Sequence, residues 1–272
     1  RLEAQKAVPT VGLLLVASDC AERLGESAAH DRCLTLLAQH GGAGGDRGSV
    51  LLRQARRVAQ LGDTAQAERV YAEAAGAFRD AGQEREWAIA RGGVADILMA
   101  RGELDEALRI RMEEELPVYA RLGDVRSKAV TQGKIADILM ARGELDEALA
   151  LHEERLPGAE KRRDIESIAH IRYSMALIRL QRGDHERGGA QAIDDDLAAA
   201  FALARQLGRV DFVAHIGALF AQVLAMRGRR DEALAVLGEA AAAFDKLGDA
   251  ASVARVASLR EAMADGNRGS SS

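Results

Sequence analysis

Two identical segments carry the side chains best suited to binding a ligand. Residues 95–108 and 136–149 both read ADILMARGELDEAL. Each copy holds an aspartate followed three residues later by a methionine, a spacing that puts both side chains on one face of a helix. A carboxylate favours basic or amide-bearing ligands, and a flexible thioether adapts to a partner helix or an extended peptide. These positions therefore predict binding chemistry.

Signatures of catalysis and of metal binding are missing from the sequence. No G-x-S-x-G or H-E-x-x-H motif occurs. Cys20, His30, Cys33 and His40 are of the types that bind zinc, but their spacing matches no usual closed site. The glycine-rich residues 41–48 lack the Gly-Lys-Ser/Thr ending of a phosphate-binding loop and indicate a linker. We predict no enzymatic activity, no metal and no cofactor.

The elements that position the two aspartates repeat along the chain. The glycine inside the shared segment recurs at spacings of 40, 41, 40 and 45, at Gly62, Gly102, Gly143, Gly183 and Gly228. A second set of turns falls between these anchor glycines, so each period holds two helices. A glycine suits the residue just past a helix end, and the acidic residue that follows suits the next helix start.

Small residues hold fixed places around each anchor glycine. They stand seven positions before it, at Ala55, Ala95, Ala136, Ala176 and Ala221, and five after it, at Ala67, Ala107, Ala148, Gly188 and Ala233. This pair of small positions resembles the tetratricopeptide repeat family. The long unit is similar to the variety found in kinesin light chains and in bacterial regulatory and sensor arrays.

The resemblance implies an all-α solenoid of stacked antiparallel helix hairpins that form a right-handed superhelix. We expect a degenerate hairpin or cap with its linker over residues 1–47. Repeat units then follow at about 48–83, 84–124, 125–164, 165–208 and 209–248, with a capping helix at 249–265 and a disordered tail at 266–272. In this family the concave face is lined by the first helix of each hairpin.

That concave face gives a set of candidate ligand-binding residues at fixed distances before the anchor glycines. They are Arg56, Asp96, Met99, Asp137, Met140, His170, Tyr173, His215 and Gln222. The two histidines occupy equivalent positions one repeat apart, for which we expect a separation of about 20 Å. The carboxylate clamp of some family members is disfavoured, because it uses asparagine and the only one here is Asn267.

Three local features give further expectations. Pro117 and Pro157 fall inside the second helix of their hairpins, so we expect a kink or break at each. Met112 continues an apolar stripe at helical spacing. The glutamates of the second helices, at 113–115 and 153–154, indicate a solvated face. The aspartates at 194–196 are typical of helix-start residues rather than metal ligands.

Composition narrows the function classes. A net charge of −5 disfavours nucleic acid as a partner, and the longest apolar run, 11–17, is too short to cross a membrane. Two cysteines fit a cytoplasmic protein, and a start at Arg1 suggests a fragment. We predict a protein- or peptide-binding scaffold or sensor module of a larger bacterial regulatory or effector protein. Alternatives are a self-associating structural scaffold and a small-molecule sensor region, and the oligomeric state stays open.

Overall fold

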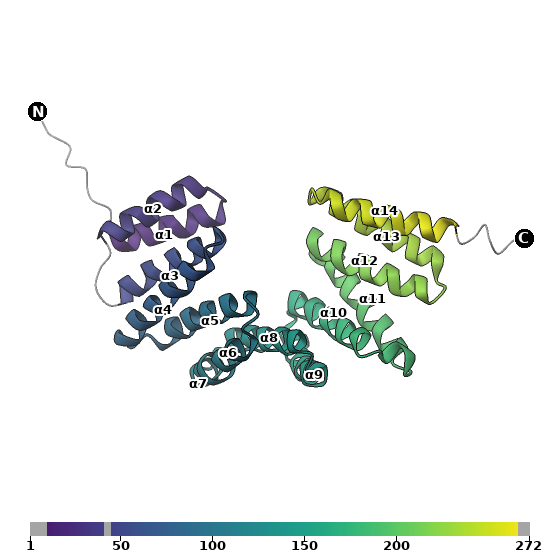
Figure 1. Ribbon diagram of the computed structural model, residues 1–272, viewed down its shortest axis with the longest axis horizontal. Coiled ribbons are helices and arrows are strands. Elements are labelled where there is room, and N and C mark those ends of the chain that lie inside the picture. The colour runs from purple at the N-terminus through teal and green to yellow at the C-terminus, as the bar shows by residue number, and fades with distance from the viewer. Residues whose placement is uncertain (1–9, 41–44, 266–272) are drawn as a thin grey trace, which may run out of the picture. The chain divides into compact units, whose positions relative to one another are not determined.

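The computed structural model describes residues 10–40 and 45–265 (Figure 1). Throughout these residues the regular structure is helix, as the sequence predicts. The chain divides into two compact units, with the boundary between Arg142 and Gly143. Within each unit, successive helices pack as antiparallel hairpins, which confirms the predicted α-solenoid of stacked helix pairs.

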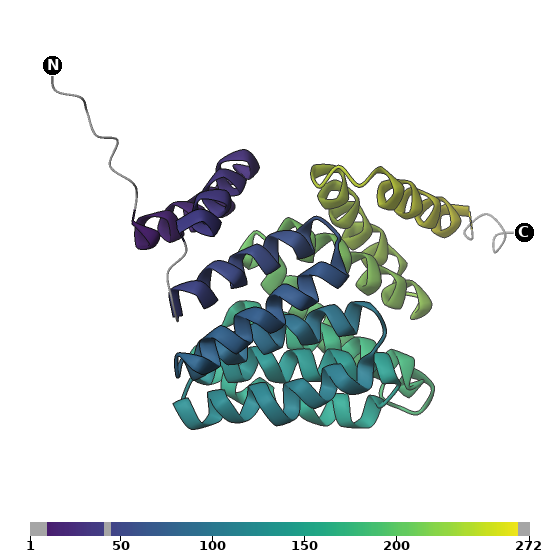
Figure 2. The same ribbon diagram turned by 60° about the vertical axis from the view of Figure 1, so that its left-hand side comes forward.

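The described part of the first unit contains three helix hairpins and the first helix of a further pair (Figure 2). Its elements are α1 (Val11–Arg23), α2 (Ser27–His40), α3 (Gly45–Gln60), α4 (Thr64–Asp80), α5 (Glu84–Ala100), α6 (Leu104–Arg109), the π-helix η1 (Ile110–Glu115), α7 (Leu116–Leu122) and α8 (Val125–Arg142). The three elements α6, η1 and α7 follow one another without a gap and form one long helix with a π turn at its centre.

The second unit continues the same pattern of paired helices. It consists of α9 (Leu145–Arg162), α10 (Ile165–Gln181), the 3₁₀ turn η2 (Asp184–Glu186), α11 (Ala190–Leu207), α12 (Val210–Met226), α13 (Arg230–Lys246) and α14 (Ala250–Asp265). The extra residues of the fourth repeat lie around η2, before α11 begins.

Turns and tight packing account for the small residues of the pattern. Gly102 and Gly143 have φ of 81° and 79°, the left-handed backbone that favours glycine after a helix. The alanines seven positions before the anchors are fully buried, which lets the paired helices approach closely. Gly188 breaks the pattern. It lies exposed in the turn before α11, because the inserted residues delay the start of that helix.

The π turn in the first unit arises from one inserted residue. The second helix of this hairpin, from Gly102 to its end at Gly123, is one residue longer than the equivalent segment from Gly143 to Arg163. A π turn absorbs one extra residue and lets the helix on both sides keep its register. The disruption expected near Pro117 is therefore present, with η1 ending two residues before the proline.

Pro157 does not break its helix. It lies exposed within α9, which runs uninterrupted from Leu145 to Arg162. Here no residue is inserted, so the helix has only a missing amide donor and the ring of an outward-facing proline to accommodate. Of the kink or break expected at this position, the break is wrong.

The π turn also changes which side chains face the core. Met112 is 51% exposed, although α-helical spacing places it on the apolar stripe. The wider turn instead directs Arg111 and Glu115 inward, and both are buried. The expectation of an inward Met112 and a fully solvated glutamate run is therefore wrong at these residues.

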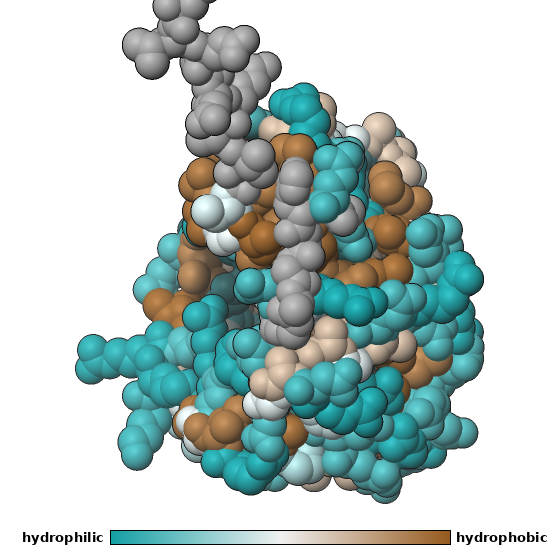
Figure 3. Space-filling view, turned by 90° about the vertical axis from the view of Figure 1, so that its left-hand side faces the viewer, coloured by the Kyte–Doolittle hydropathy of each residue, from teal (hydrophilic) through white to brown (hydrophobic). Residues whose placement is uncertain are grey.

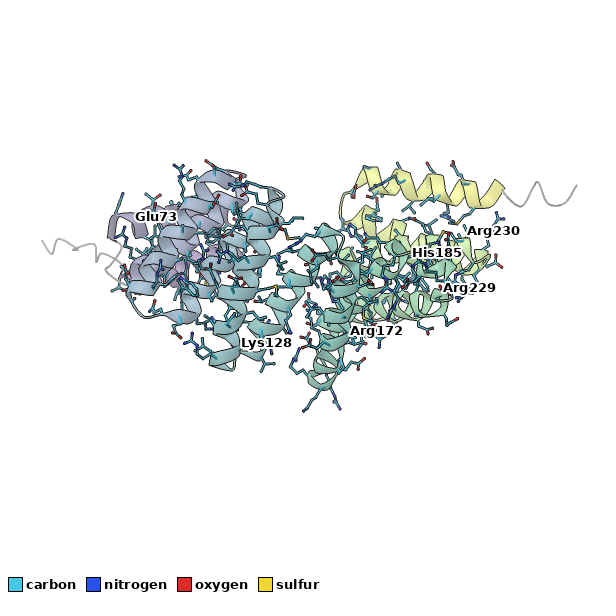
Figure 4. The ribbon with its side chains drawn as sticks, turned by 60° about the horizontal axis from the view of Figure 1, so that its bottom comes forward. Glu73, Lys128, Arg172, His185, Arg229 and Arg230 are labelled. Atoms are coloured by element: carbon cyan, nitrogen blue, oxygen red, sulfur yellow. The ribbon has the colours of Figure 1, made fainter. Side chains whose placement is uncertain are left out.

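Two of the three consecutive aspartates, Asp194 and Asp196, pair with arginines. They lie inside α11, after its first turn, and not at a helix start as the sequence suggested. Asp196 pairs with Arg172 and Arg179 from α10. Asp194 pairs with Arg227 and Arg229. Arg172 and Arg229 are labelled in Figure 4. Burial raises the pKa of Asp196, and the two arginines oppose this shift.

One end of the first unit carries exposed apolar side chains. Figure 3 shows brown apolar residues gathered in the upper part of this end. Leu13 and Val16 of α1, with Leu24 just after it, are each at least 60% exposed. Among the described helices, none has the length and hydropathy needed to cross a membrane.

Candidate functional site

Asp96, a candidate residue of the first unit, already has two cationic neighbours. Asp96 Oδ1 accepts a hydrogen bond from Arg111 Nη2 at 2.7 Å and lies 3.2 Å from Lys134 Nζ. The Asp96 side chain is 49% exposed, so one part of it still faces solvent. The electrostatic preference of Asp96 for a basic ligand is weakened by both partners.

Arg111 connects Asp96 to a buried carboxylate. Its second Nη donates to Glu115, and both of these side chains are almost fully buried. A Cβ at Gly92 would lie 2.8 Å from both Arg111 Nη1 and Glu115 Oε1, so the glycine makes room for the pair. Arg111 Nε is buried without a hydrogen-bond partner among the described residues. This cluster positions Asp96 and packs the π turn.

The other candidates of the first unit lie at its surface. Arg56 is exposed on α3, and Met99, Asp137 and Met140 are half-buried on α5 and α8. Burial raises the pKa of the Tyr71 hydroxyl. The charge of Arg56 lowers that pKa and the charge of Asp96 raises it, so both charged groups lie near Tyr71. All four candidate side chains are at least partly accessible to solvent.

A hollow in the second unit gathers three of the predicted residues. His170 and Tyr173 from α10 line it together with Asp211, Phe212, His215 and Ile216 from α12, and its volume is about 200 Å³. The expected separation of about 20 Å between the two histidines is therefore wrong. Successive first helices of a solenoid are neighbours in one layer, at the 8–10 Å distance of packed helices.

Hydrogen bonding fixes the chemistry of one wall. His215 Nδ1 lies 2.8 Å from the carbonyl oxygen of Asp211, which can only accept, so Nδ1 carries the proton. The Nε2 of a neutral ring is then an acceptor. The His215 ring also meets Phe244 edge-on, with 5.2 Å between centroids, which holds its orientation.

The acidic group of the hollow is ionised. Arg209 donates two hydrogen bonds to Asp211, at 2.9 and 2.7 Å, and lowers the pKa of that carboxyl to about 2. The same guanidinium pairs with Glu166 of α10 and stacks over Phe212, 4.6 Å from its ring centroid. Burial raises the pKa of Tyr173, so its hydroxyl stays protonated at neutral pH.

Two residues that line the hollow, Asp211 and Phe212, were not among the residues predicted from the sequence, and one predicted residue, Gln222, lies outside it. Asp211 and Phe212 precede His215 by one helical turn, which is the signal that could have placed them beside it. Gln222 is exposed further along α12 and does not line the hollow. Across the described ranges, no group of three or more His, Cys, Asp or Glu side chains is arranged to hold a metal ion. His30 Nδ1 instead contacts the carbonyl oxygen of Ser18 at 3.0 Å.

Comparison with known proteins identifies the fold. No protein-family model and no curated protein matches the chain. A putative kinesin light chain of Podosopora anserina with nearly identical TPR-like repeats is 19% identical with a TM-score of 0.55, over 74% of this chain and 96% of that one.

Two Rap proteins superpose over more of the chain. The apo form of RapI is 11% identical with a TM-score of 0.67, over 95% of this chain and 99% of that one. The Rap conjugation gene regulator of the plasmid pLS20, in complex with the Phr* peptide, is 13% identical with a TM-score of 0.62, over 93% of this chain and 74% of that one. At sequence identities this low, the structural similarity establishes the fold alone. It confirms, for the fold, the resemblance to tetratricopeptide repeats that the small residues indicated.

Proposed function

We propose that this chain, which has the tetratricopeptide-like repeat fold, is a non-catalytic module that binds a peptide or protein segment. The observation that carries the proposal is the hollow between α10 and α12, with ring side chains from both helices on its walls. Its volume of about 200 Å³ suits one side chain of a longer ligand, because pockets for drug-sized molecules are ~300–1,000 Å³.

The fold supports the same proposal by analogy. The pLS20 regulator, which shares this architecture, is complexed with a peptide. Fold alone does not carry function, so the hollow and not the likeness is the basis of the proposal. The further suggestion that the module senses a signal for a larger bacterial regulatory or effector protein, in the cytoplasm, rests on family resemblance.

A random heptapeptide display library selected on the immobilised protein tests the proposal. Enriched peptides would be synthesised, labelled and titrated by fluorescence anisotropy. We expect binding that Tyr173→Ala with His215→Ala weakens by roughly tenfold, the loss of a pair of anchoring contacts. Gln181→Ala, an exposed change on the same helix α10, is the matched control. The proposal would be overturned if no peptide were enriched, or if Tyr173→Ala with His215→Ala left the affinity unchanged.

The candidate residues of the first unit are a second proposed contact surface for the same ligand class. Asp137 and Met140 on α8, with Met99 on α5, are half-buried and offer a carboxylate beside two adaptable thioethers. Asp96→Ala combined with Asp137→Ala in the same titration separates this surface from the hollow. Undiminished binding in that variant would remove the first unit from the proposed binding surface.

Self-association is the second candidate function, because exposed Leu13, Val16 and Leu24 lie together on the first hairpin. Multi-angle light scattering over a concentration range measures it directly. A monomer at every concentration excludes the scaffold function, whereas a dimer that Leu13→Asp converts to monomer would support it.

A further inference from the structure

The walls of the hollow in the second unit present aromatic surface from two helices. Tyr173 on α10 and Phe212 on α12 contribute rings, and the imidazoles of His170 and His215 extend this lining. The Phe212 ring already has the Arg209 guanidinium over one face, so Tyr173 is the aromatic ring that a ligand can approach. Aromatic rings attract a cation to their faces, and the attraction grows as the cation is removed from water. Ring walls alone would also accept an apolar side chain, so charge has to decide between these ligands.

Charged groups around the hollow leave an excess of negative charge. Asp211 lines it, and Glu166 approaches from α10, with Arg209 shared between these two carboxylates. Among these described groups, the two carboxylates outnumber the one guanidinium group and leave one net negative charge.

The hydrogen-bonding groups point to the same kind of ligand. With Nδ1 bound to the Asp211 carbonyl, neutral His215 offers an acceptor at Nε2. The Asp211 carboxylate is acceptor-only, and the Tyr173 hydroxyl can accept as well as donate. A group rich in N–H donors satisfies these acceptors, whereas a carboxylate or carbonyl has no donor to offer to Asp211 or to Nε2 of His215.

We infer that the hollow between α10 and α12 selects a basic side chain, lysine or arginine, from the bound peptide. This inference rests on the proposed function and specifies its ligand. The aliphatic stem of the basic residue would lie between the rings and Ile216, and its cationic head would lie at Asp211 and His215. Arg209 orders Asp211 through two hydrogen bonds, so the carboxylate is already oriented before the ligand arrives.

The test uses the display library on three proteins. These are the unchanged chain, Asp211→Asn, and the control Glu239→Gln, which removes an exposed acid of the same unit that lies outside the hollow. Circular dichroism first establishes that each variant keeps the helix content and melting temperature of the parent. A selected peptide is then titrated beside an analogue in which norleucine replaces its basic residue.

We expect one position of the selected peptides to be enriched in lysine and arginine. Norleucine at that position should weaken binding to the parent and to Glu239→Gln by about tenfold, the effect of losing one charge-assisted contact. In Asp211→Asn the basic and norleucine peptides should bind within about twofold of each other. Peptides selected without a basic residue would overturn the inference and leave peptide binding intact.

Two further outcomes also count against the inference. If Asp211→Asn still preferred the basic peptide over its norleucine analogue as strongly as the parent does, the cationic group would bind at another acidic site of the protein. A library that yields no peptide on the parent would overturn the proposed function, and this inference with it.

Discussion

Arg111 and Glu115 form an ion pair inside the π turn of the first unit, with side chains only 5% and 7% exposed. Neither residue belongs to the apolar pattern from which the repeat is recognised. Because two charges are removed from water, the pair contributes little net stability relative to apolar residues of similar size, yet each charge depends strongly on its partner. Its effect on the protein is therefore best seen when one partner is removed.

Neutralising Glu115 should be costly. In Glu115→Gln the Arg111 guanidinium stays buried with only the half-exposed Asp96 as a counter-charge, so we expect a loss of roughly 3–5 kcal/mol in the free energy of unfolding. Urea denaturation followed by the fluorescence of Trp87, which packs in a cluster with Val118 and Tyr119 of α7, reports on this region. Glu106→Gln breaks an exposed pair with Arg109 and should cost at most ~1 kcal/mol. Equal losses in the two variants would contradict this expectation.

Gly92 provides the space that this pair occupies. Gly92→Ala would bring a methyl group to 2.8 Å from Arg111 Nη1 and Glu115 Oε1, so it should destabilise the protein by about 1–3 kcal/mol despite the better helix propensity of alanine. Gly76→Ala on α4 meets nothing within 4 Å and should stabilise by about 0.5–1 kcal/mol. The two substitutions are chemically identical, and the same urea titration should give them opposite signs. A stabilising Gly92→Ala would show that the ion pair can move aside freely.

The inserted residue itself can be removed. Deleting exposed Met112 should convert the π turn to regular α-helix, keep the register on both sides, and leave Arg111 three residues from its partner, still within reach on a helix. Deleting exposed Glu154 from α9 should rotate the rest of that helix by about 100° and expose buried Ala159. Thermal unfolding by circular dichroism should show a markedly lower melting temperature for the second deletion. A comparable fall in both would mean that η1 does not arise from an insertion.

Most of the fold could be predicted from the sequence because the repeat imposes a local pattern. The left-handed turn at Gly102 favours glycine, and the close helix contact at Ala95 favours a small residue, so both features can be recognised from single residue types. The π turn could not be read in the same way. It depends on counting one residue more between Gly102 and Gly123 than between Gly143 and Arg163, a difference that the expectation of proline kinks concealed.

The candidate site was only partly predictable, for a different reason. Position in the repeat places His170, Tyr173 and His215 on the first helices of their hairpins, and these three line one hollow. It does not reveal what each polar group already binds. Asp96 is engaged by Arg111 and Lys134, contacts between helices that depend on side-chain packing rather than on spacing.

A buried histidine in α9 makes the stability of the second unit depend on pH. His152 is fully buried, its Nδ1 accepts from Arg155, and burial together with the charges of Arg155 and His170 lowers its pKa to about 3. The unfolded chain takes up this proton near pH 6.5, while the folded chain does not until about pH 3. Stability from this group is therefore fully present above pH 6.5 and falls by about 1.4 kcal/mol per unit as the pH drops toward 3.

His152→Leu should remove that slope. Urea denaturation followed by circular dichroism at pH 7, 6 and 5 measures it, and the parent should lose about 2 kcal/mol more than the variant between about pH 6.5 and 5. Carboxylates titrate in both proteins, so the difference between the two curves isolates the histidine. His185→Leu, an exposed change in the same unit, is the control and should leave the slope unaltered. Parallel curves for the parent and His152→Leu would mean that the buried imidazole gains its proton without unfolding the unit.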